Sequence, residues 1–530
     1  MKILKKQFLS CCKDLDIIKI HGNNVEITSL QYDSRKVEPG AVFFALPGLH
    51  VDGSKFINSA IEKGAVAVVH ETKLNSYVEG VCYLHVKDAR KAMAPISACF
   101  FDFPSEKMKV IGVTATEGKS STVSFIWQLL NAMGKTAGYF STVSYAYGKK
   151  ETANPEHQTT PESITVQERL HEMIQAGCEY AVVEASSHGL SPKTGRLDNV
   201  HFDAGVFINV THEHLEFHGS FENYRNDKAN LFRALNLYDH DEKSSLRFGV
   251  VNLDDPSAEF FINATSKPVF GFSVTSKHIF KNLKADNFQF GLYAENITES
   301  AEGISFTINK IIPELMSTKI QDVNIRLAGK FNVQNILASI ITVSKITSTD
   351  IKDVLSCLNK IKPITGRMCL VNEGQDFEVL IDYAHTPSSF ETILPPIYKR
   401  IKTANKKLIA VFGSGGERDT QKRPEQGRIA SKYCDIIILA NEDPRGENPT
   451  ELLEMIATGC TNKKRNEELF IIPNRPTAIK KAFSLASPGD AVLLLGKGHE
   501  NSIIFKDHII PYDEEKEARN ALKAMVNKYV

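Results

Sequence analysis

A turn with a lysine and two adjacent serines lies between a predicted strand and a predicted helix. It is part of GVTATEGKSST, residues 112–122, which follows the apolar segment 109–114 and precedes a helical apolar stripe. Such a turn gathers backbone N–H groups at a helix N-terminus, where anions bind. Lys119 is therefore predicted to contact the β- and γ-phosphates of a nucleotide, and Ser120 to contact Mg²⁺. The usual pattern needs glycine at position 113, where valine stands, so an ordinary strand–turn–helix is the alternative.

Two further polar segments follow predicted strands. Glu184 ends the apolar run YAVVE and lies close to Ser186 and a histidine, which suits a hard metal ion or a substrate; a capped strand end is the alternative. His212, His214 and His218 lie among glutamates after the run AGVFINV. Because no H-E-x-x-H pattern and no neighbouring cysteine is present, Mg²⁺ with one imidazole ligand is favoured over zinc. Surface histidines are the alternative.

Four polar loops in the C-terminal third each begin where an apolar run ends. The carboxyl ends of parallel strands share one edge of a sheet, so these loops are predicted to line one crevice. Arg418, Arg423 and Arg445 suit carboxylate or phosphate binding, because a guanidinium can hold either group through two hydrogen bonds. The loops are residues 380–387, 411–424, 439–449 and 494–500.

The composition disfavours several classes of protein. With 63 basic and 63 acidic residues among 530, the net charge is zero, which argues against a large nonspecific nucleic-acid surface. Nine cysteines occur without a C-x-x-C pair, so reduced thiols are expected and no zinc site is predicted. The first residues are too charged for a signal peptide, and no apolar run reaches the ~18 residues typical of a membrane helix. A soluble, cytoplasmic protein is expected.

Short apolar runs rich in Val and Ile alternate with stretches long enough for helices. This alternation predicts α/β domains with mostly parallel sheets. The runs are residues 109–114, 180–186, 204–210, 248–253, 379–383, 408–412, 435–440 and 491–495. Segments 101–109 and 359–368 suggest domain boundaries, and segment 265–325 is predicted to add further sheet. The predicted domains are residues 1–107, 108–361 and 362–530.

The order of the motifs resembles the Mur ligase family, most closely its muramoyl-tripeptide synthetase branch. The resemblance extends from about residue 28 to about residue 505 and depends on the ordered set rather than on one motif. In that family the first glycine of the phosphate loop stands where Gly112 is, while Ala115 and Glu117 replace the usual Gly and Asn. The shared motifs are DSRKVEPGAVFFALPG, TTPES, EASSHGL, HEHLEFHG, DKANLF, GKFNVQN, DYAHTP, GGERD, EDPRGENP and GKGHE.

This resemblance implies three α/β domains. They are a small N-terminal domain for the UDP substrate, a central P-loop-type ATPase domain with a mostly parallel sheet, and a C-terminal Rossmann-like domain for the incoming amino acid. The implied activity is that of an ATP-dependent amide ligase of peptidoglycan synthesis with ATP and Mg²⁺ as cofactors. ATP phosphorylates the D-Glu carboxylate of UDP-N-acetylmuramoyl-L-Ala-D-Glu, and the amine of a free diamino acid attacks the acyl phosphate. No nucleic-acid partner and no membrane insertion are expected, and a monomer is favoured.

The resemblance also assigns roles to individual residues. The expected catalytic residues are Lys119, Glu184, His214 and Lys228. The expected Mg²⁺ ligands are Ser120, Glu184, His214 and Lys228, the last as a carbamylated lysine. The expected ATP-binding residues are Ala115, Thr116, Glu117, Gly118, Lys119, Ser120, Ser121, Asn332, Asn335, Arg367 and Asp382. The expected residues for the UDP substrate are Ser34, Thr159, Thr160, Ser186 and Arg196. The expected residues for the amino acid are Arg418, Glu442, Asp443, Pro444, Arg445, Gly496 and Glu500.

The segment EDPR, residues 442–445, bears on which amino acid is added. Arg445 favours a distal carboxylate, as in meso-diaminopimelate. Asp443 stands where diaminopimelate-adding members have Asn, and its negative charge would suit the cationic side chain of ornithine or lysine. Between these opposing indications, meso-diaminopimelate is preferred.

Two other functions are alternatives to this interpretation. Another Mur-type or folylpolyglutamate-type ligase would share parts of the pattern, but the motifs DSRKVEPG, EDPR and GKGHE disfavour it. A nucleotide-binding regulatory homologue with a decayed site is suggested by Ala115 and Glu117. The joint presence of Lys119, Glu184 and Lys228, together with His214, favours catalysis.

Overall fold

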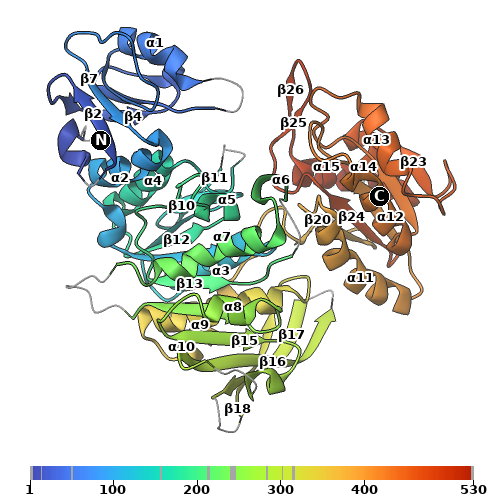
Figure 1. Cartoon of the computed structure of the whole chain (residues 1–530). Helices are drawn as coiled ribbons and strands as arrows, with labels where there is room; N and C mark the ends of the chain where they lie inside the picture. The colour runs from blue at the N-terminus through green and yellow to red at the C-terminus, as the bar shows by residue number, and fades with distance from the viewer. Residues whose placement is uncertain are drawn as a thin grey trace. The chain divides into compact units, whose positions relative to one another are not determined.

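The computed structural model divides into two compact units, and Figure 1 shows their elements. The first consists of Met1–Tyr293, Asn309–Thr318 and Asn335–Leu358, and the second of Ala294–Ile308, Lys319–Gln334 and Asn359–Val530. The domain boundaries near residues 107 and 361 stay predictions. The structure describes residues 4–13, 15–48, 52–154, 158–211, 215–238, 246–281, 285–300, 303–312 and 317–526.

The N-terminal part of the first unit is built on a five-stranded sheet with strand order β2-β7-β6-β5-β4. Neighbours from β7 to β4 are parallel, and β2 pairs with β7 in the antiparallel sense. The strands are β1 Lys6–Gln7, β2 Ile17–His21, β3 Glu26–Ile27, β4 Ser29–Gln31, β5 Ala41–Ala45, β6 Ala65–His70 and β7 Cys82–Val86. The helices are η1 Phe8–Cys11, η2 Ser34–Lys36, η3 Gly53–Phe56, α1 Ile57–Glu62, α2 Ala89–Phe100 and η4 Pro104–Glu106.

An eleven-stranded sheet follows, with order β11-β10-β9-β12-β8-β13-β14-β15-β16-β17-β18. Neighbours from β9 to β16 in this order are parallel, whereas β10 pairs antiparallel with β9 and β11. The strands are β8 Lys109–Thr114, β9 Ala137–Phe140, β10 Ser144–Tyr147, β11 Lys150–Ala153, β12 Tyr180–Glu184, β13 Ala204–Phe207, β14 Phe248–Asn252, β15 Val269–Ser273, β16 Phe288–Ser300, β17 Gly303–Ile311 and β18 Thr318–Ile325.

The chain leaves β8 through helix α3 and returns as β9, two places away, with β12 filling the gap and β13 on the other side of β8. The strand order therefore changes direction at β8, which is where open α/β sheets bind ligands. The helices of this part are α3 Lys119–Ala132, α4 Ser163–Gln175, α5 Ser187–Leu190, α6 Leu215–His218, α7 Phe221–Ala234, α8 Ala258–Ile262, η5 Lys277–Lys281, α9 Asn332–Thr347, α10 Ile351–Leu355 and η6 Leu358–Lys360.

The C-terminal part has a six-stranded sheet with order β19-β20-β24-β21-β22-β23, parallel except for β19. The strands are β19 Cys369–Leu370, β20 Glu378–Asp382, β21 Leu408–Phe412, β22 Ile436–Leu439, β23 Leu469–Ile471 and β24 Ala491–Leu495, followed by the hairpin β25 Ser502–Ile504 and β26 Ile509–Pro511. The helices are α11 Pro387–Thr403, α12 Lys422–Tyr433, α13 Pro449–Ala457, α14 Arg475–Leu485 and α15 Glu514–Val526.

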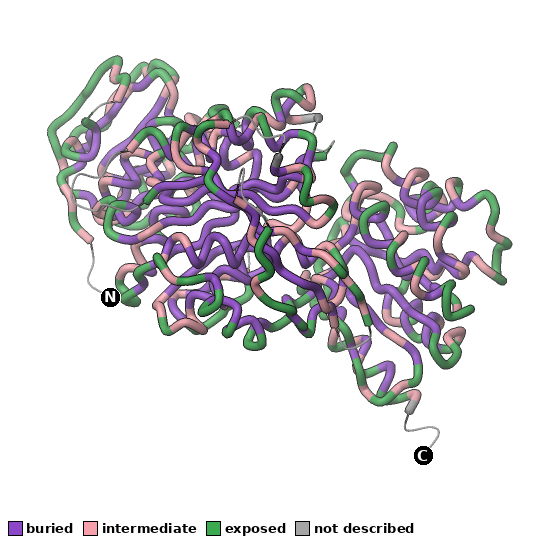
Figure 2. The backbone as a smooth tube through the Cα atoms, turned by 90° about the horizontal axis from the view of Figure 1, so that it is seen from below, coloured by how far each residue is buried: buried purple, intermediate pink, exposed green. Residues whose placement is uncertain are grey.

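The predicted α/β fold with mostly parallel sheets is confirmed. The apolar runs 109–114, 408–412 and 491–495 coincide with β8, β21 and β24, and the other five predicted strands differ from the observed ones by one to three residues at an end. The segment 265–325 adds β15 to β18 to the sheet, as predicted. The central strands are the most continuously buried segments (Figure 2), because helices cover both faces of a parallel sheet. In the described part of the chain, none of the helices has the length and apolar character needed to cross a bilayer.

Candidate active site

The predicted phosphate loop connects β8 to α3 and is held in place by Asn209, which follows β13. The backbone N–H groups of Thr116 and Glu117 donate to Asn209 Oδ1 at 3.1 and 2.9 Å, and Asn209 Nδ2 donates to the Glu117 carbonyl at 3.0 Å. Gly118 has φ 89° at the start of α3, a left-handed conformation that favours glycine. Asn209 fixes the loop but was not among the predicted site residues.

Two lysines converge on the carbonyl groups of this loop. Lys119 Nζ donates to the carbonyls of Ala115 and Thr116 at 3.1 and 2.9 Å. Lys228 Nζ, from α7, donates to the same Ala115 carbonyl at 2.5 Å and lies 4.5 Å from the ring centre of Tyr224. The Lys228 side chain is buried, whereas Lys119 is half-buried. Two ammonium groups around one loop create the positive field that a polyphosphate needs.

Glu184 lies at the end of β12, level with Val113 of β8, and faces the start of α3. Ser120 Oγ lies 3.1 Å from each of its carboxylate oxygens. The Thr142 N–H donates to Glu184 Oε2 at 2.7 Å, and the Thr142 hydroxyl lies 3.2 Å from Oε1. Glu184 is almost fully buried. The residues fit Mg²⁺, because a carboxylate and a hydroxyl in contact supply the oxygen ligands that this ion prefers.

Four of the five residues predicted for the UDP substrate lie together behind Glu184. The Thr160 hydroxyl donates to the Glu184 carbonyl at 2.8 Å and accepts from the Ser186 N–H at 3.0 Å. Thr159 Oγ1 lies 3.0 Å from Thr142 Oγ1, and Arg196 donates to the Thr160 carbonyl at 3.0 Å. The residues that meet here are Thr159, Thr160, Ser186 and Arg196.

Arg196 has a second partner that sequence reasoning missed. Its Nη2 donates to Glu162 Oε1 at 2.9 Å, while Arg90 of α2 donates to Glu162 Oε2 at 3.0 Å. The Arg90–Glu162 ion pair joins α2 to the start of α4, two helices that lie side by side in Figure 1, and the Arg196–Glu162 ion pair joins the segment after α5 to the same glutamate. The fifth predicted residue, Ser34, lies in η2, where its carbonyl accepts from Lys63 Nζ at 3.0 Å.

Only part of the histidine-rich segment lies within the residues that the structure describes. His212 and His214 lie outside the residues that the structure describes, so the role predicted for His214 stays a prediction. His218 is buried, with Nδ1 2.8 Å from Asp227 Oδ2 and Nε2 3.1 Å from the Ser187 hydroxyl. Both of its ring nitrogens are engaged by protein groups. In the described part of the chain, no three His, Cys, Asp or Glu side chains form a cluster that could hold a metal ion.

The remaining predicted ATP-binding residues lie in both units. Asn335 of α9 accepts from the Thr122 hydroxyl at 3.2 Å, and a Cβ on Gly118 would come within 2.7 Å of its Oδ1. Ser121 is buried in the first turn of α3. Asn332 begins α9 and donates to the Ala328 carbonyl at 2.7 Å.

In the second unit, Asp382 accepts from the N–H groups of Met368 and Ala384, both at 2.8 Å, and burial raises the pKa of its carboxyl. Arg367 lies 4.9 Å from the ring centre of Tyr383.

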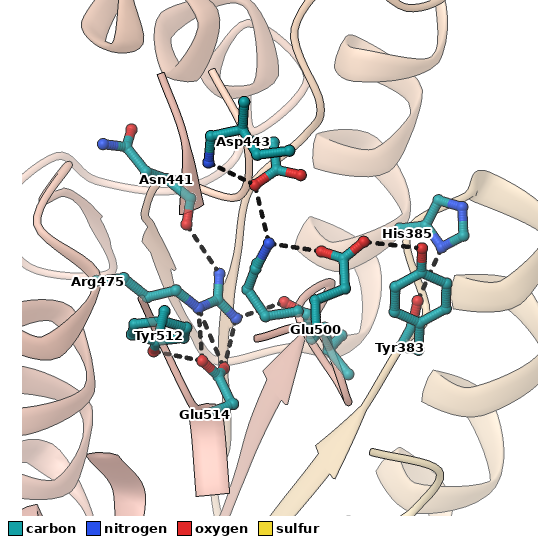
Figure 3. Close-up of polar contacts among 11 residues, drawn as sticks. Tyr383, His385, Asn441, Asp443, Arg475, Glu500, Tyr512 and Glu514 are labelled. Carbon is teal, nitrogen blue, oxygen red and sulfur yellow. Dashed lines mark hydrogen bonds and ion pairs between the residues drawn. The ribbon is translucent and has the colours of Figure 1, made fainter. Parts of the chain in front are cut away.

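The C-terminal loops do meet at the carboxyl ends of their strands, and a lysine connects two of them. The fully buried Lys497 lies beside two carboxylates, with Nζ 2.9 Å from Asp443 Oδ1 and 2.5 Å from Glu500 Oε2. Asp443 also accepts from the Ile504 N–H at 3.0 Å, and Glu500 accepts from the Tyr383 hydroxyl at 3.2 Å. Figure 3 shows Asp443, Glu500 and Tyr383 in this network.

Glu442, next to Asp443, differs from these paired carboxylates. It is buried, its Oε2 has no hydrogen-bond partner among the described residues, and burial raises the pKa of its carboxyl. A Cβ at Gly496 would come within 2.7 Å of that oxygen, so glycine at 496, with φ 100°, leaves room beside it. An unpaired buried carboxylate oxygen is costly unless a ligand or a proton compensates it.

Two arginines of the C-terminal part support the fold rather than facing a ligand. The guanidinium of Arg423 is buried and binds Glu447 through two hydrogen bonds of 2.7 and 2.8 Å. The interpretation of Arg423 as a ligand-binding residue is therefore wrong, because its guanidinium is buried and its Nη1 and Nη2 donate within the protein. Arg475 was not predicted; it pairs with the buried Glu514, which also binds Tyr512 (Figure 3).

The other arginines predicted to bind the amino acid have different surroundings. Arg418 is exposed in the loop after β21. Arg445 is half-buried at φ 51°, and its N–H donates to the Ile504 carbonyl at 2.9 Å. Pro444, between Asp443 and Arg445, is buried. Neither Arg418 nor Arg445 forms an ion pair with a carboxylate of the described residues, so both guanidinium groups remain suited to a ligand.

Three family models together match most of the chain. The Mur ligase family catalytic domain matches residues 26–100, the Mur ligase middle domain matches residues 113–343, and the Mur ligase glutamate ligase domain matches residues 366–498. The chain belongs to the Mur ligase family, which confirms the resemblance predicted from its motifs. Members of this family are ATP-dependent ligases, so the predicted class of enzyme is confirmed as well.

Similar proteins extend over the whole chain. It is 58% identical to the UDP-N-acetylmuramyl-tripeptide synthetase of Treponema denticola, over 98% of both chains, and 47% identical to that of Treponema pallidum, over 99% of both. It is 35% identical to the UDP-N-acetylmuramoyl-L-alanyl-D-glutamate–2,6-diaminopimelate ligase of Geobacillus kaustophilus, over 95% of this chain and 96% of the other. A solved structure of a ligase with that same name has 27% identity and a TM-score of 0.61, covering 98% and 99% of the two chains.

Proposed function

We propose that the protein joins a diamino acid to the terminal D-Glu of UDP-N-acetylmuramoyl-L-Ala-D-Glu at the expense of ATP, as a step of peptidoglycan synthesis. The observation that carries the proposal is the contact between Ser120 and Glu184 beside Lys119 and Lys228, at the start of α3. This arrangement suits a polyphosphate bound with a divalent ion. The proposed substrate is supported by the name of the relative at 35% identity, a UDP-N-acetylmuramoyl-L-alanyl-D-glutamate–2,6-diaminopimelate ligase, and the relatives at 58% and 47% identity are named tripeptide synthetases.

The proposed reaction has two steps. A carboxylate oxygen of D-Glu forms a bond to the γ-phosphorus of ATP, and the bond from that phosphorus to the bridging oxygen breaks, which releases ADP. The amine nitrogen of the diamino acid then bonds to the acyl carbon, the bond to the phosphate oxygen breaks, and the nitrogen loses a proton. The first step brings two anions together, so neutralisation of charge is its main requirement.

The residues of the central site supply that neutralisation. Lys119, which donates to the loop carbonyls of Ala115 and Thr116, can transfer these hydrogen bonds to phosphate oxygens when ATP binds. Bound Mg²⁺ supplies further charge neutralisation; Ser120, Glu184, His214 and a carbamylated Lys228 are its proposed ligands. Thr160, Ser186 and Arg196 are proposed to orient the UDP substrate, because they lie directly behind Glu184.

The C-terminal network bears on the incoming amino acid. Asp443 had suggested ornithine or lysine because of its negative charge, but Lys497 compensates that charge inside the protein. Glu442 offers a buried oxygen to an ammonium group, which every diamino acid carries. Arg418 and Arg445 can bind carboxylates, and meso-diaminopimelate has one more carboxylate than ornithine or lysine. We therefore favour meso-diaminopimelate.

The test is phosphate release by the purified protein with ATP, Mg²⁺, the UDP-dipeptide and one amino acid at a time. Release is expected only when both substrates are present, with a higher kcat/KM for meso-diaminopimelate than for ornithine or lysine. Turnover with ornithine or lysine alone would overturn the preferred amino acid but not the reaction. ATP binding without any turnover would favour a regulatory homologue instead.

A further inference from the structure

Two cysteines of the N-terminal part lie in direct contact, and neither belongs to the site described above. Cys11 ends η1 and Cys99 lies in the last turn of α2, and their sulfur atoms are 2.6 Å apart. The structure describes all nine cysteines as thiols, and this is the one pair among them with sulfur atoms in contact. The separation exceeds the ~2.05 Å of a disulfide bond by only about 0.6 Å. We propose that Cys11 and Cys99 are a site of reversible oxidation and form a disulfide that ties η1 to α2.

The surroundings give the two thiols different roles. Cys99 is half-exposed, whereas Cys11 is buried. The contact with the Cys11 thiol and the nearby Lys6 and Lys13 lower the pKa of Cys99 to about 7, while the same contact and burial raise the pKa of Cys11. A thiolate is the form that attacks oxidants. Cys99 is thus the attacking residue, and Cys11 is the resolving residue beside it.

Lys6 is fixed in this position by the chain around it. It lies in β1 and forms an ion pair with Asp102, which follows α2 and is close in sequence to Cys99. The ion pair keeps an ammonium group close to the two sulfur atoms, so the stabilisation of the Cys99 thiolate depends on the same contact between β1 and the end of α2. By contrast, Cys12, the next residue after Cys11, is buried and directs its thiol at the Phe8 carbonyl, 3.3 Å away.

The oxidation can be written with a peroxide as the oxidant. The Cys99 thiolate attacks one oxygen of hydrogen peroxide, the O–O bond breaks, and sulfenic acid and hydroxide form. The sulfur of Cys11 then bonds to the sulfur of Cys99, the S–O bond breaks, and the Cys11 proton leaves with the hydroxyl group as water. The overall change is two thiols and one peroxide to one disulfide and two waters, and a dithiol reductant reverses it by exchange.

The disulfide would enclose most of the N-terminal part of the chain. The loop from residue 11 to residue 99 contains the complete five-stranded sheet and Ser34. A bridge that closes so long a loop restricts the unfolded chain strongly. Oxidation is therefore expected to stabilise this part of the protein, while the central site, which contains neither cysteine, keeps its contacts.

The experiment treats the folded full-length protein with hydrogen peroxide and maps its peptides without reduction. We expect a peptide pair joined through Cys11 and Cys99, which dithiothreitol separates. In the oxidised form, the midpoint temperature of the first unfolding transition should rise by about 5 °C. Cys11→Ser should leave a sulfenic acid on Cys99 that dimedone traps, and Cys12→Ser is the matched control that still forms the bridge. Free Cys99 after peroxide treatment of the folded protein, or a bridge that involves Cys12 instead of Cys11, would overturn the proposal.

Discussion

The central site and the C-terminal site use their charged residues in opposite ways. In the central site, Lys119 donates to backbone carbonyls, and Glu184 accepts from hydroxyls and an N–H. In the C-terminal site, Lys497 pairs with two carboxylates and Arg475 pairs with Glu514. Neutral partners leave a charge available to a ligand, whereas an opposite charge compensates it within the fold.

This contrast separates residues that serve the reaction from residues that serve the fold. Removing a cation held by carbonyls should cost turnover and little stability, because no buried carboxylate loses its partner. Removing a buried cation held by carboxylates should cost stability first, because an uncompensated charge is left inside. The predictions below test this division.

The largest effect is expected for Lys119→Ala. Turnover should fall about 10³-fold or more, since the substitution removes a cation aimed at the transferred phosphoryl group. The unfolding free energy should change by no more than about 1 kcal/mol, because Lys119 is half-buried and, among the described residues, is bound only to carbonyls. Steady-state kinetics and urea titration measure both quantities, with the exposed Lys150→Ala as the control. A large loss of stability with Lys119→Ala would remove the distinction between the two sites.

Lys497→Met should reduce stability first, in contrast to the loss of turnover expected for Lys119→Ala. It leaves the buried Asp443 and the half-buried Glu500 without their cation and should destabilise the second unit by about 3–5 kcal/mol. Adding Asp443→Asn and Glu500→Gln to the same chain should recover part of that loss, because the uncompensated charges are removed. Thermal and urea unfolding measure the effect, and Lys464→Met, at an exposed ion pair, is the control. Unchanged stability with lost activity would mean that Lys497 serves the ligand directly.

Glu442→Gln tests the buried carboxylate of the C-terminal site whose Oε2 has no hydrogen-bond partner among the described residues. Burial raises the pKa of Glu442, so in the folded state it binds a proton over a pH range in which the unfolded chain has already lost it. The wild-type protein therefore loses stability as pH rises from about 4.5 through the raised pKa. Glutamine carries no charge, so the variant should gain stability over the wild type as pH rises. Urea unfolding at pH 5 and pH 8 measures this, and an equal difference at both values would contradict it.

The smallest effect is expected for Glu117→Asn. The loop contacts with Asn209 use the backbone of Glu117, and the substitution leaves these contacts in place. Removal of a half-buried carboxylate next to the phosphate site should leave ATP affinity unchanged or improve it by less than about tenfold. Calorimetric titration with a nonhydrolysable ATP analogue measures it. A large loss of affinity would show that Glu117 takes part in binding.

The strands were predictable because buried parallel strands are continuous apolar runs, as β8, β21 and β24 illustrate. The carboxylate at the end of β12 was predictable because Glu184 interrupts such a run at a strand end. Contacts between residues that are distant in sequence were not predictable. Arg475 and Glu514 are 39 residues apart, and Arg423 and Glu447 are 24 apart. An arginine after a strand looks the same in sequence whether it meets a ligand or a glutamate of the protein itself, so Arg423 was misinterpreted.

The central claim is that the central site transfers a phosphoryl group to the D-Glu carboxylate before the amide forms. The direct test uses UDP-dipeptide labelled with oxygen-18 in that carboxylate, together with ATP and the accepted diamino acid. Mass spectrometry of the released phosphate should show one labelled oxygen per amide bond, because the carboxylate oxygen leaves with the phosphate. Unlabelled phosphate with full formation of the tripeptide product would contradict the acyl-phosphate route and the role assigned to the central site.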